Sequence, residues 1–319
     1  MELVKAKVPT RRAFSERLSE LGDRDSGFAV FESDIGRSTY SYLFGDRFPG
    51  RYFNMGIAEV STMAAAAGMA ACGRTVFVCG YGVFLTMRAV EVVRSFICYP
   101  NLDVKIMSSH GGVTAAIDGV THQATEDIAF MTTLPNMKVL CPSDSASARG
   151  SVEIALATRG PVFTRLMRDP LYELYDAGER FELGGSKRPR RGSDLTIAAY
   201  GDMVFQALEA ARLLESRGVD AEVLDLYSIK PFDREALLAS VGKTGALLVV
   251  ENHQRRNGLA YEIGMALLKE RSTARFDALG LDDTFAESGD YAGVLEAYGL
   301  SAARIAATAL RLVADKGRK

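Results

Sequence analysis

Short apolar runs that alternate with helix-forming stretches constrain the fold of this chain more than any other feature. In the first half, each near-continuous apolar run is followed by a longer stretch that suits a helix. Strands of this kind are typical of a parallel sheet with helices on both faces. The expected strands lie at 27–31, 75–79, 103–107, 137–141 and 161–166, and the expected helices at 58–72, 84–98, 124–132 and 145–158.

The alternation stops once and then resumes. Residues 181–193 are rich in Gly, Ser, Pro and Arg, which predicts a linker. Two α/β domains are therefore expected, one over residues 1–185 and a smaller one over residues 193–319. In the second domain we expect strands at 195–200, 221–226, 246–250 and 275–279, and helices at 206–216, 234–241, 259–269 and 302–314.

Charge and cysteine content argue against several classes of protein. The 319 residues include 38 Lys and Arg and 40 Asp and Glu, without a basic stripe that would bind nucleic acid. No apolar run reaches membrane-spanning length, and charges stand near the N-terminus where a signal peptide needs an apolar core. No Cys-x-x-Cys pair occurs, so we expect a cytoplasmic protein with four reduced, buried thiols: Cys72, Cys79, Cys98 and Cys141.

The segment Asn-Met-Gly-Ile-Ala-Glu at 54–59 places the carboxylate of Glu59 at the start of an expected helix. A Glu in this position often interacts only with the positive end of the helix dipole. The helix itself is rich in Ala, Gly and Ser, and such small side chains allow another backbone to approach closely. This pattern suits a subunit interface, and equally a helix packed inside the chain.

Polar and aromatic residues follow the expected strands of the first domain. Asp34 follows the first strand, Tyr81 and Phe84 the second, His110 the third, and Arg165 ends the fifth. Each residue alone admits a structural role, such as a turn cap, a core ring or an internal ion pair. Because ligands bind at the carboxyl ends of parallel strands, their common placement predicts one functional site.

Two of the three histidines lie close together in the sequence. His110 stands in Ser-Ser-His-Gly-Gly at 108–112, and His122 in Asp-Gly-Val-Thr-His-Gln at 118–123, which begins with Asp118. The third, His253, follows an expected strand and precedes a Gly-containing helix. For His253 we expect a surface or capping role.

These motifs together resemble the C-terminal half of transketolases, and the resemblance covers essentially the whole chain. Residues 57–59, Ile-Ala-Glu, match the segment that carries the family's glutamate, and residues 82–85, Gly-Val-Phe-Leu, match the segment whose ring stacks on the aminopyrimidine of thiamine diphosphate. The loop 118–123 is the most specific signal, and His110 keeps the transketolase spacing before it. The resemblance implies a pyrimidine-binding domain followed by a transketolase C-terminal domain.

The resemblance also implies cofactor contacts. Glu59 would hydrogen-bond the far pyrimidine nitrogen and favour the imino tautomer, whose nitrogen takes the proton from the thiazolium carbon. Ile57, Phe84 and Asp34 would contact thiamine diphosphate as well.

Substrate contacts follow from the same resemblance. Transketolases hold the sugar phosphate with two arginines, a serine and a histidine, and arginine's planar fork suits a phosphate. Asp118 and His122 would contact the sugar hydroxyls, with His122 near the carbonyl oxygen. The four matched phosphate contacts are Arg11, Ser38, His110 and Arg165.

One motif of the family is missing from this sequence. Transketolases bind Mg²⁺ and the diphosphate with Gly-Asp-Gly followed further on by Asn, and this chain has no such segment in a suitable context. The resemblance therefore implies a partner chain that supplies the diphosphate-binding domain and the metal ligands, in a heterotetramer with two copies of each chain.

The expected function is that of the small subunit of a split transketolase, which transfers a two-carbon ketol unit from a ketose phosphate to an aldose or another aldehyde. The beta subunit of a 2-oxo-acid dehydrogenase is an alternative, disfavoured because its family lacks this pattern of His and Asp. A non-catalytic assembly subunit is a third interpretation.

Overall fold

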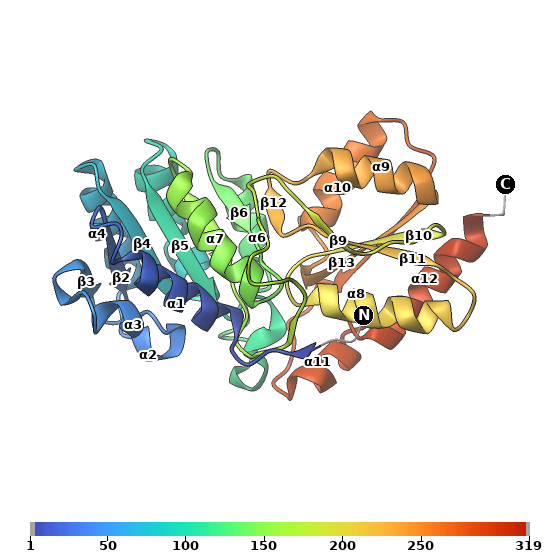
Figure 1. The fold of residues 1–319 in the computed structure, drawn as a ribbon, viewed down its shortest axis with the longest axis horizontal. Coiled ribbons are helices and arrows are strands. Elements are labelled where there is room, and N and C mark those ends of the chain that lie inside the picture. Colours follow the sequence, from blue (N-terminus) through green and yellow to red (C-terminus); the bar gives the residue numbers. More distant parts are fainter. Residues whose placement is uncertain (1–3, 317–319) are drawn as a thin grey trace.

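The computed structural model of the protein describes residues 4–316, which form two sheets side by side along the long axis (Figure 1). The first sheet has the order β12-β6-β7-β5-β4-β2-β3 and the second β14-β13-β10-β11-β9, while β1 (Val4–Lys5) and β8 (Tyr172–Glu173) form a separate pair. The first sheet contains β2 (Phe28–Glu32), β3 (Tyr52–Asn54), β4 (Thr75–Tyr81), β5 (Val104–Ser109), β6 (Lys138–Leu140), β7 (Val162–Arg165) and β12 (Ser228–Lys230). The second contains β9 (Lys187–Arg190), β10 (Leu195–Ala199), β11 (Ala221–Asp225), β13 (Ala246–Gln254) and β14 (Arg275–Leu281).

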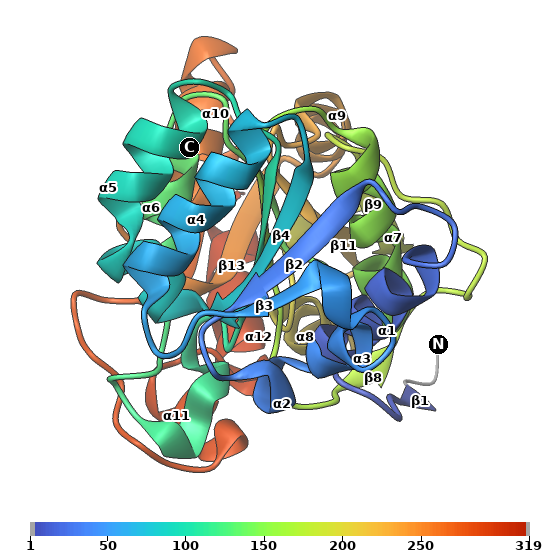
Figure 2. The same ribbon diagram turned by 90° about the vertical axis from the view of Figure 1, so that its left-hand side faces the viewer.

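Helices cover both faces of the first sheet, as the apolar strands require. Figure 2 shows α4, α5 and α6 on one face and α1, α3 and α7 on the other. The first domain's helices are α1 (Thr10–Leu21), α2 (Gly36–Thr39), α3 (Tyr42–Gly45), α4 (Glu59–Ala71), α5 (Val90–Val92), α6 (Asp127–Thr133) and α7 (Ser145–Ala157). The second domain has α8 (Met203–Glu215), α9 (Arg234–Thr244), α10 (Leu259–Lys269), α11 (Tyr291–Ala297) and α12 (Ala302–Lys316).

The structure confirms an α/β fold with largely parallel sheets, and it corrects several local predictions. The linker at 181–193 is not wholly irregular, because β9 within it pairs antiparallel with β11. The helix at 84–98 is interrupted: π-helical turns η2 (Phe84–Arg88) and η3 (Val93–Cys98) flank the short α5. Helix α6 begins only at Asp127, and α1 was not predicted.

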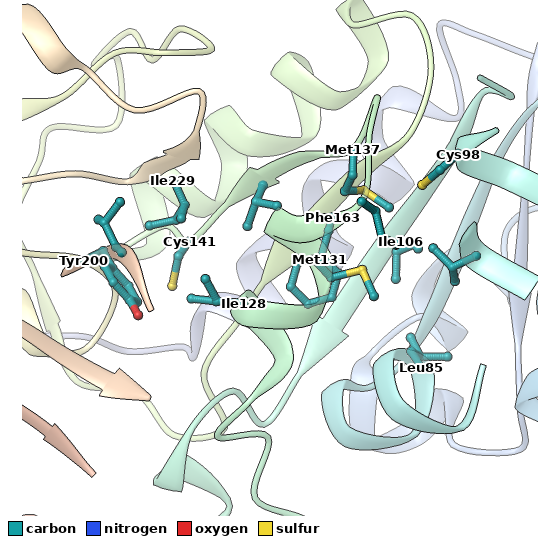
Figure 3. Packing of buried hydrophobic residues seen from close by; sticks show 14 of the residues in the cluster. Leu85, Cys98, Ile106, Ile128, Met131, Met137, Cys141, Phe163, Tyr200 and Ile229 are labelled. Atoms are coloured by element: carbon teal, nitrogen blue, oxygen red, sulfur yellow. The ribbon is translucent and has the colours of Figure 1, made fainter. Parts of the chain in front are cut away.

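The two sheets share a hydrophobic core. Strand β12 leaves the second domain and pairs antiparallel with β6 at the edge of the first sheet. In Figure 3, Tyr200 and Ile229 from the second half of the chain lie beside Cys141 and Ile128 from the first half. Because this cluster is continuous, the second domain packs directly against the β6 side of the first sheet.

Three of the four cysteines are buried, as expected, and all four are free thiols. Cys72 is exposed because it stands just past the end of α4, so the prediction of burial is wrong for this residue. Within residues 4–316, no helix has the length and apolar character needed to cross a bilayer.

Asp144 joins the start of α7 to the segment that leaves the first domain. One carboxylate oxygen accepts the backbone N–H of Ser147 at 2.8 Å, which caps the helix, and the other accepts the N–H groups of Leu174 and Tyr175 at 2.9 Å. Asp144 is buried, and so are its hydrogen bonds from Ser147 and Leu174, so loss of the carboxylate leaves at least these two donors without an acceptor.

Asp144→Ala should lower the free energy of unfolding by about 2 to 4 kcal/mol, since it removes a helix cap and leaves buried N–H groups unpaired. Urea unfolding of the purified chain measures the change. Asp290→Ala is the matched control, because exposed Asp290 caps the start of α11 through the N–H of Gly293, and its loss should cost about 1 kcal/mol. Equal losses for the two variants would contradict the tie between α7 and the outgoing segment.

Candidate active site

Four neighbouring strands of the first sheet bring polar side chains to one edge. Strands β2, β4, β5 and β7 are parallel, so their carboxyl ends lie together. Ser38 follows β2, Tyr81 ends β4, His110 follows β5, and Arg168 lies just beyond β7. Tyr81 contacts both Ser38 and His110, and Arg168 joins them through Arg11 and Asp118.

His110 lies at the centre of this group. Its ring is 4.2 Å from the Tyr81 ring, centroid to centroid, and its Nδ1 is 2.7 Å from the hydroxyl of Ser109. Only 2% of the residue is exposed, and burial, followed by Arg11 and Arg168, lowers its pKa to about 3. His110 is therefore neutral at pH 7, and the 3.9 Å separation between its Nε2 and Asp118 is not an ion pair at that pH.

Two arginines converge beside His110. Arg11 Nη1 donates to Ser38 Oγ at 3.0 Å, and Arg11 Nε donates to the carbonyl oxygen of Arg168 at 2.9 Å. Ser38 Oγ also accepts the Tyr81 hydroxyl at 2.8 Å. Arg168 Nε lies 3.5 Å from Asp118, so the loop 118–123 reaches the same group. Two guanidinium groups, a hydroxyl and a neutral imidazole form a site suited to an anion.

The structure contradicts the predicted substrate role of Arg165. This arginine is only 2% exposed, and its Nε donates to Asp127 at 3.0 Å. Its Nη2 donates to the carbonyl oxygens of Ala124 and Asn252. With its guanidinium turned into the domain junction, Arg165 offers no donor to a substrate, and Arg168 is the arginine that faces Asp118 and Arg11.

Glu59 lies at a second part of the site. It is 4% exposed at the start of α4 and accepts a hydrogen bond from Arg88 Nη1 at 2.7 Å. The Arg88 guanidinium lies over the Phe84 ring, with its carbon 4.6 Å from the ring centroid. Phe84 in turn meets the His122 ring edge-on, 5.4 Å between centroids. The chain of contacts from Glu59 to His122 links this carboxylate to the anion site.

The remaining candidates lie at the rim. Ile57 is 77% exposed just before α4. Asp34 is exposed with a left-handed backbone, φ 60°, and its carboxylate accepts the side-chain amide of Asn54 at 2.9 Å. Among residues 4–316, no group of three His, Cys, Asp or Glu side chains could hold a metal ion.

His253 is buried, so the predicted surface position is wrong, whereas the capping role is confirmed. Its Nε2 accepts the backbone N–H of Ala129 in the first turn of α6, at 3.3 Å. Burial lowers its pKa to about 4, which keeps the ring neutral as a hydrogen-bond acceptor. Its contacts serve the domain junction.

Sequence reasoning missed two members of the site, Arg168 and Arg88. Tyr81 was included among the strand-end residues but received no specific role. Arg168 lies beyond the strand end that drew attention to Arg165, and only the turn between them decides which guanidinium faces outward. Arg88 is one helical turn past Phe84, a spacing that places the two side chains on one face.

The low pKa of His110 makes its contribution to stability depend on pH. Below about pH 6.5 the unfolded imidazole takes up a proton, whereas the folded one stays neutral until about pH 3. As the pH falls through this window, the wild type should therefore lose unfolding free energy through protonation of the unfolded His110, a loss that His110→Gln does not suffer. Between pH 7.5 and 4.5, the difference between the two proteins should shift by on the order of 2 kcal/mol. Urea unfolding at each pH gives the free energy of unfolding of both proteins. If the two plots of this free energy against pH run parallel, they contradict a buried, neutral His110.

Comparison with known proteins agrees with this geometry. Residues 6–172 match the transketolase pyrimidine-binding domain, and residues 184–305 match the transketolase C-terminal domain. A putative transketolase C-terminal section from Methanocaldococcus jannaschii is 35% identical over 93% of this chain and 93% of its own length. A 6-deoxy-6-sulfo-D-fructose transketolase subunit from a Clostridium species is 35% identical over 92% of this chain and 91% of its own length.

Among solved structures, a split-gene transketolase described as an inactive beta4 tetramer superimposes with a TM-score of 0.88. It is 39% identical and covers 97% of this chain and 99% of its own. Together with the two matched domains, these similarities show that the chain belongs to the transketolase family as a split, C-terminal type of subunit.

Proposed function

We propose that this protein is the small subunit of a heteromeric transketolase that moves a two-carbon ketol unit from a ketose phosphate to an aldose or aldehyde. The observation that carries the proposal is the chain of contacts from Glu59 through Arg88, Phe84, His122 and Tyr81 to His110 in the anion site. An acid–base group for the cofactor and an anion site for the substrate are thus adjacent.

The residues around Glu59 fit the aminopyrimidine of thiamine diphosphate. Arg88 shows the fit, because its flat guanidinium lies over the Phe84 ring while it hydrogen-bonds to the buried Glu59 carboxylate. A flat, hydrogen-bonding group is therefore accommodated between these two side chains. When bound, thiamine diphosphate supplies the carbanion that carries the two-carbon unit. Glu59 would hold a proton at the pyrimidine, Phe84 would support the ring, and Arg88 would move aside.

The anion site would hold the phosphate end of the sugar. In this proposal Arg168 takes the place expected for Arg165, and it acts with Arg11, Ser38 and His110. Neutral His110 can donate one hydrogen bond without the cost of a buried charge. Asp118 and His122 would contact hydroxyls nearer the cofactor, since His122 packs against Phe84.

A partner chain would cover the outer face of α4 and supply Mg²⁺ ligands and the diphosphate site. Ile57 just before this helix and Val60 in its first turn are exposed, as are Phe96 in η3 and Tyr99 just past it. Segment η3 packs against α4, and α5, which leads into η3, lies beside α4 in Figure 2. A side chain added at Gly68 would meet nothing within 4 Å, so this glycine is not required by packing inside the chain. An apolar face lined with small residues suits a subunit interface. We further propose a heterotetramer with two copies of each chain, in the cytoplasm.

Dependence on a partner is the first test. The chain alone should show little or no binding of thiamine diphosphate with Mg²⁺ by calorimetry, because the diphosphate motif is absent from the sequence. The complex with a co-purified, diphosphate-binding partner should bind the cofactor and transfer a ketol unit. The description of a similar chain as an inactive beta4 tetramer supports this expectation. Ketol transfer by the single chain would contradict the split-enzyme proposal.

In the active complex, Glu59→Gln should lower the turnover rate by at least about a hundredfold, the scale of a lost acid–base group, while the fold persists. A near-normal rate would mean that Glu59 has no acid–base role and only interacts with the positive end of the helix dipole. Glu16→Gln, in an exposed ion pair with Arg12 on α1, is the control and should leave the rate unchanged.

Arg168 tests the substrate class. Arg168→Ala should raise the KM of a phosphorylated ketose about ten- to a hundredfold, as expected for loss of a charge-assisted contact, with a smaller effect on the unphosphorylated sugar. Arg234→Ala removes an exposed ion pair on α9 and should change neither value. Equal effects on both sugars would reject the anion role. Preferred turnover of a 2-oxo acid by the wild-type complex would favour a dehydrogenase-type subunit instead.

A further inference from the structure

The loop that follows β5 and carries His110, Asp118 and His122 rests on the second domain. At its base, the side-chain oxygen of Asn252 accepts the backbone N–H of Val113 at 2.8 Å. At its far end, Gln123 Nε2 donates to the carbonyl oxygen of Glu287 at 3.4 Å. Both proposed substrate contacts, His110 and Asp118, thus flank a turn whose anchor lies more than a hundred residues away in the sequence.

The backbone of this loop needs an anchor. His110 has φ 64° and Ala116 φ 47°, and residues other than glycine rarely adopt these values. Each such residue costs of order 1 kcal/mol or more and persists only where its surroundings hold it. Gly112 is also left-handed, φ 59°, and a side chain there would collide with Asn252, whereas one at Gly111 would collide with Arg165.

Asn252 is itself held in one orientation. It is fully buried at the end of β13, and its side-chain nitrogen donates to Asp202 at 2.6 Å. Asp202 also accepts a hydrogen bond from the hydroxyl of Tyr291. The backbone carbonyl oxygen of Asn252 accepts one from Arg165 Nη2 at 2.7 Å. Because the amide nitrogen must face the carboxylate, the amide oxygen must face Val113. The orientation of one amide therefore fixes where the loop begins.

We propose that Asn252 is a positioning residue of the active site, through which the second domain sets the distance between His110 and Asp118. It would touch neither substrate nor cofactor. The proposal rests on the proposed substrate role of the loop, and it gives the C-terminal domain a part in substrate binding. Loss of the anchor should loosen the loop and weaken sugar binding, but leave Glu59, Phe84 and cofactor binding as they are.

Hydrogen exchange of the separate chain tests the anchor without cofactor or partner. Asn252→Leu keeps the approximate size but removes the acceptor for Val113. The double variant Asn252→Asp/Asp202→Asn keeps an oxygen beside Val113 and exchanges the amide and the carboxylate of the buried pair. In the Leu variant, amides of residues 110–123 should exchange about five- to tenfold faster, the equivalent of one lost hydrogen bond, while amides of β10 and β13 hold. The double variant should restore most of the protection.

Thr196→Val is the matched control. Thr196 is buried in β10 of the same domain and shares hydrogen bonds with Ser240 and Thr244, none of which belongs to the loop. This variant should leave exchange of residues 110–123 unchanged. The proposal is overturned if Asn252→Leu leaves the loop as protected as in the wild type, or if it speeds exchange equally throughout the chain.

Kinetics of the assembled complex then test the consequence. Asn252→Leu should raise the KM of the ketose phosphate about tenfold, consistent with a contact mispositioned by loss of one or two hydrogen bonds, with the affinity for thiamine diphosphate within about twofold of wild type. Equal weakening of sugar and cofactor would overturn the positioning role. If the wild-type complex shows no ketol transfer at all, the proposed function fails, whereas the exchange experiment still decides whether Asn252 anchors the loop.

Discussion

The buried guanidinium of Arg165 is the interaction on which the domain junction and the site both depend. It lies between the carboxylate of Asp127, at the start of α6, and the carbonyl oxygen of Asn252, in the second domain. A buried charge is tolerated only when partners satisfy it, and loss of one partner leaves the other exposed to the full desolvation cost. Because Gly111 packs directly on this arginine, the position of His110 is tied to the same junction.

The site divides into two parts with different physical character. Around Glu59, the Arg88 guanidinium hydrogen-bonds to the carboxylate and lies over the Phe84 ring, an arrangement that suits a flat heterocycle in the same place. Around His110, cations and neutral donors converge, and the two nearby carboxylates both pair with Arg168: Asp118 with its Nε at 3.5 Å and Asp169 with its Nη1 at 3.1 Å. The rings of Tyr81, Phe84 and His122 lie between the two parts and contact one another, so they connect the Glu59 part to the His110 part.

Local pattern was sufficient for most of the fold. Strands buried on both faces read as apolar runs, so β2, β4, β5, β7, β10, β11 and β13 were all expected close to their observed bounds. Elements whose residues are mixed in character were missed. The helix α1 has polar residues over much of its surface, and β9 is a run of Lys, Arg and Pro that becomes a strand only because the edge of β11 is open to it. Strand β12 changes sheets, which no local pattern can specify.

The sequence by itself determined the class of fold and the absence of a diphosphate motif, and it placed the candidate site at the carboxyl ends of the strands, because each of these depends on residue type and spacing along the chain. Only the tertiary structure decided which of two neighbouring arginines, Arg165 or Arg168, faces the site, since a turn of the backbone after β7 sends one inward and the other out. It also decided that Asn252 lies under the loop and that Arg88 pairs with Glu59. These contacts join residues far apart in the sequence, or depend on how a helix is wound, and the packing of the two domains sets them.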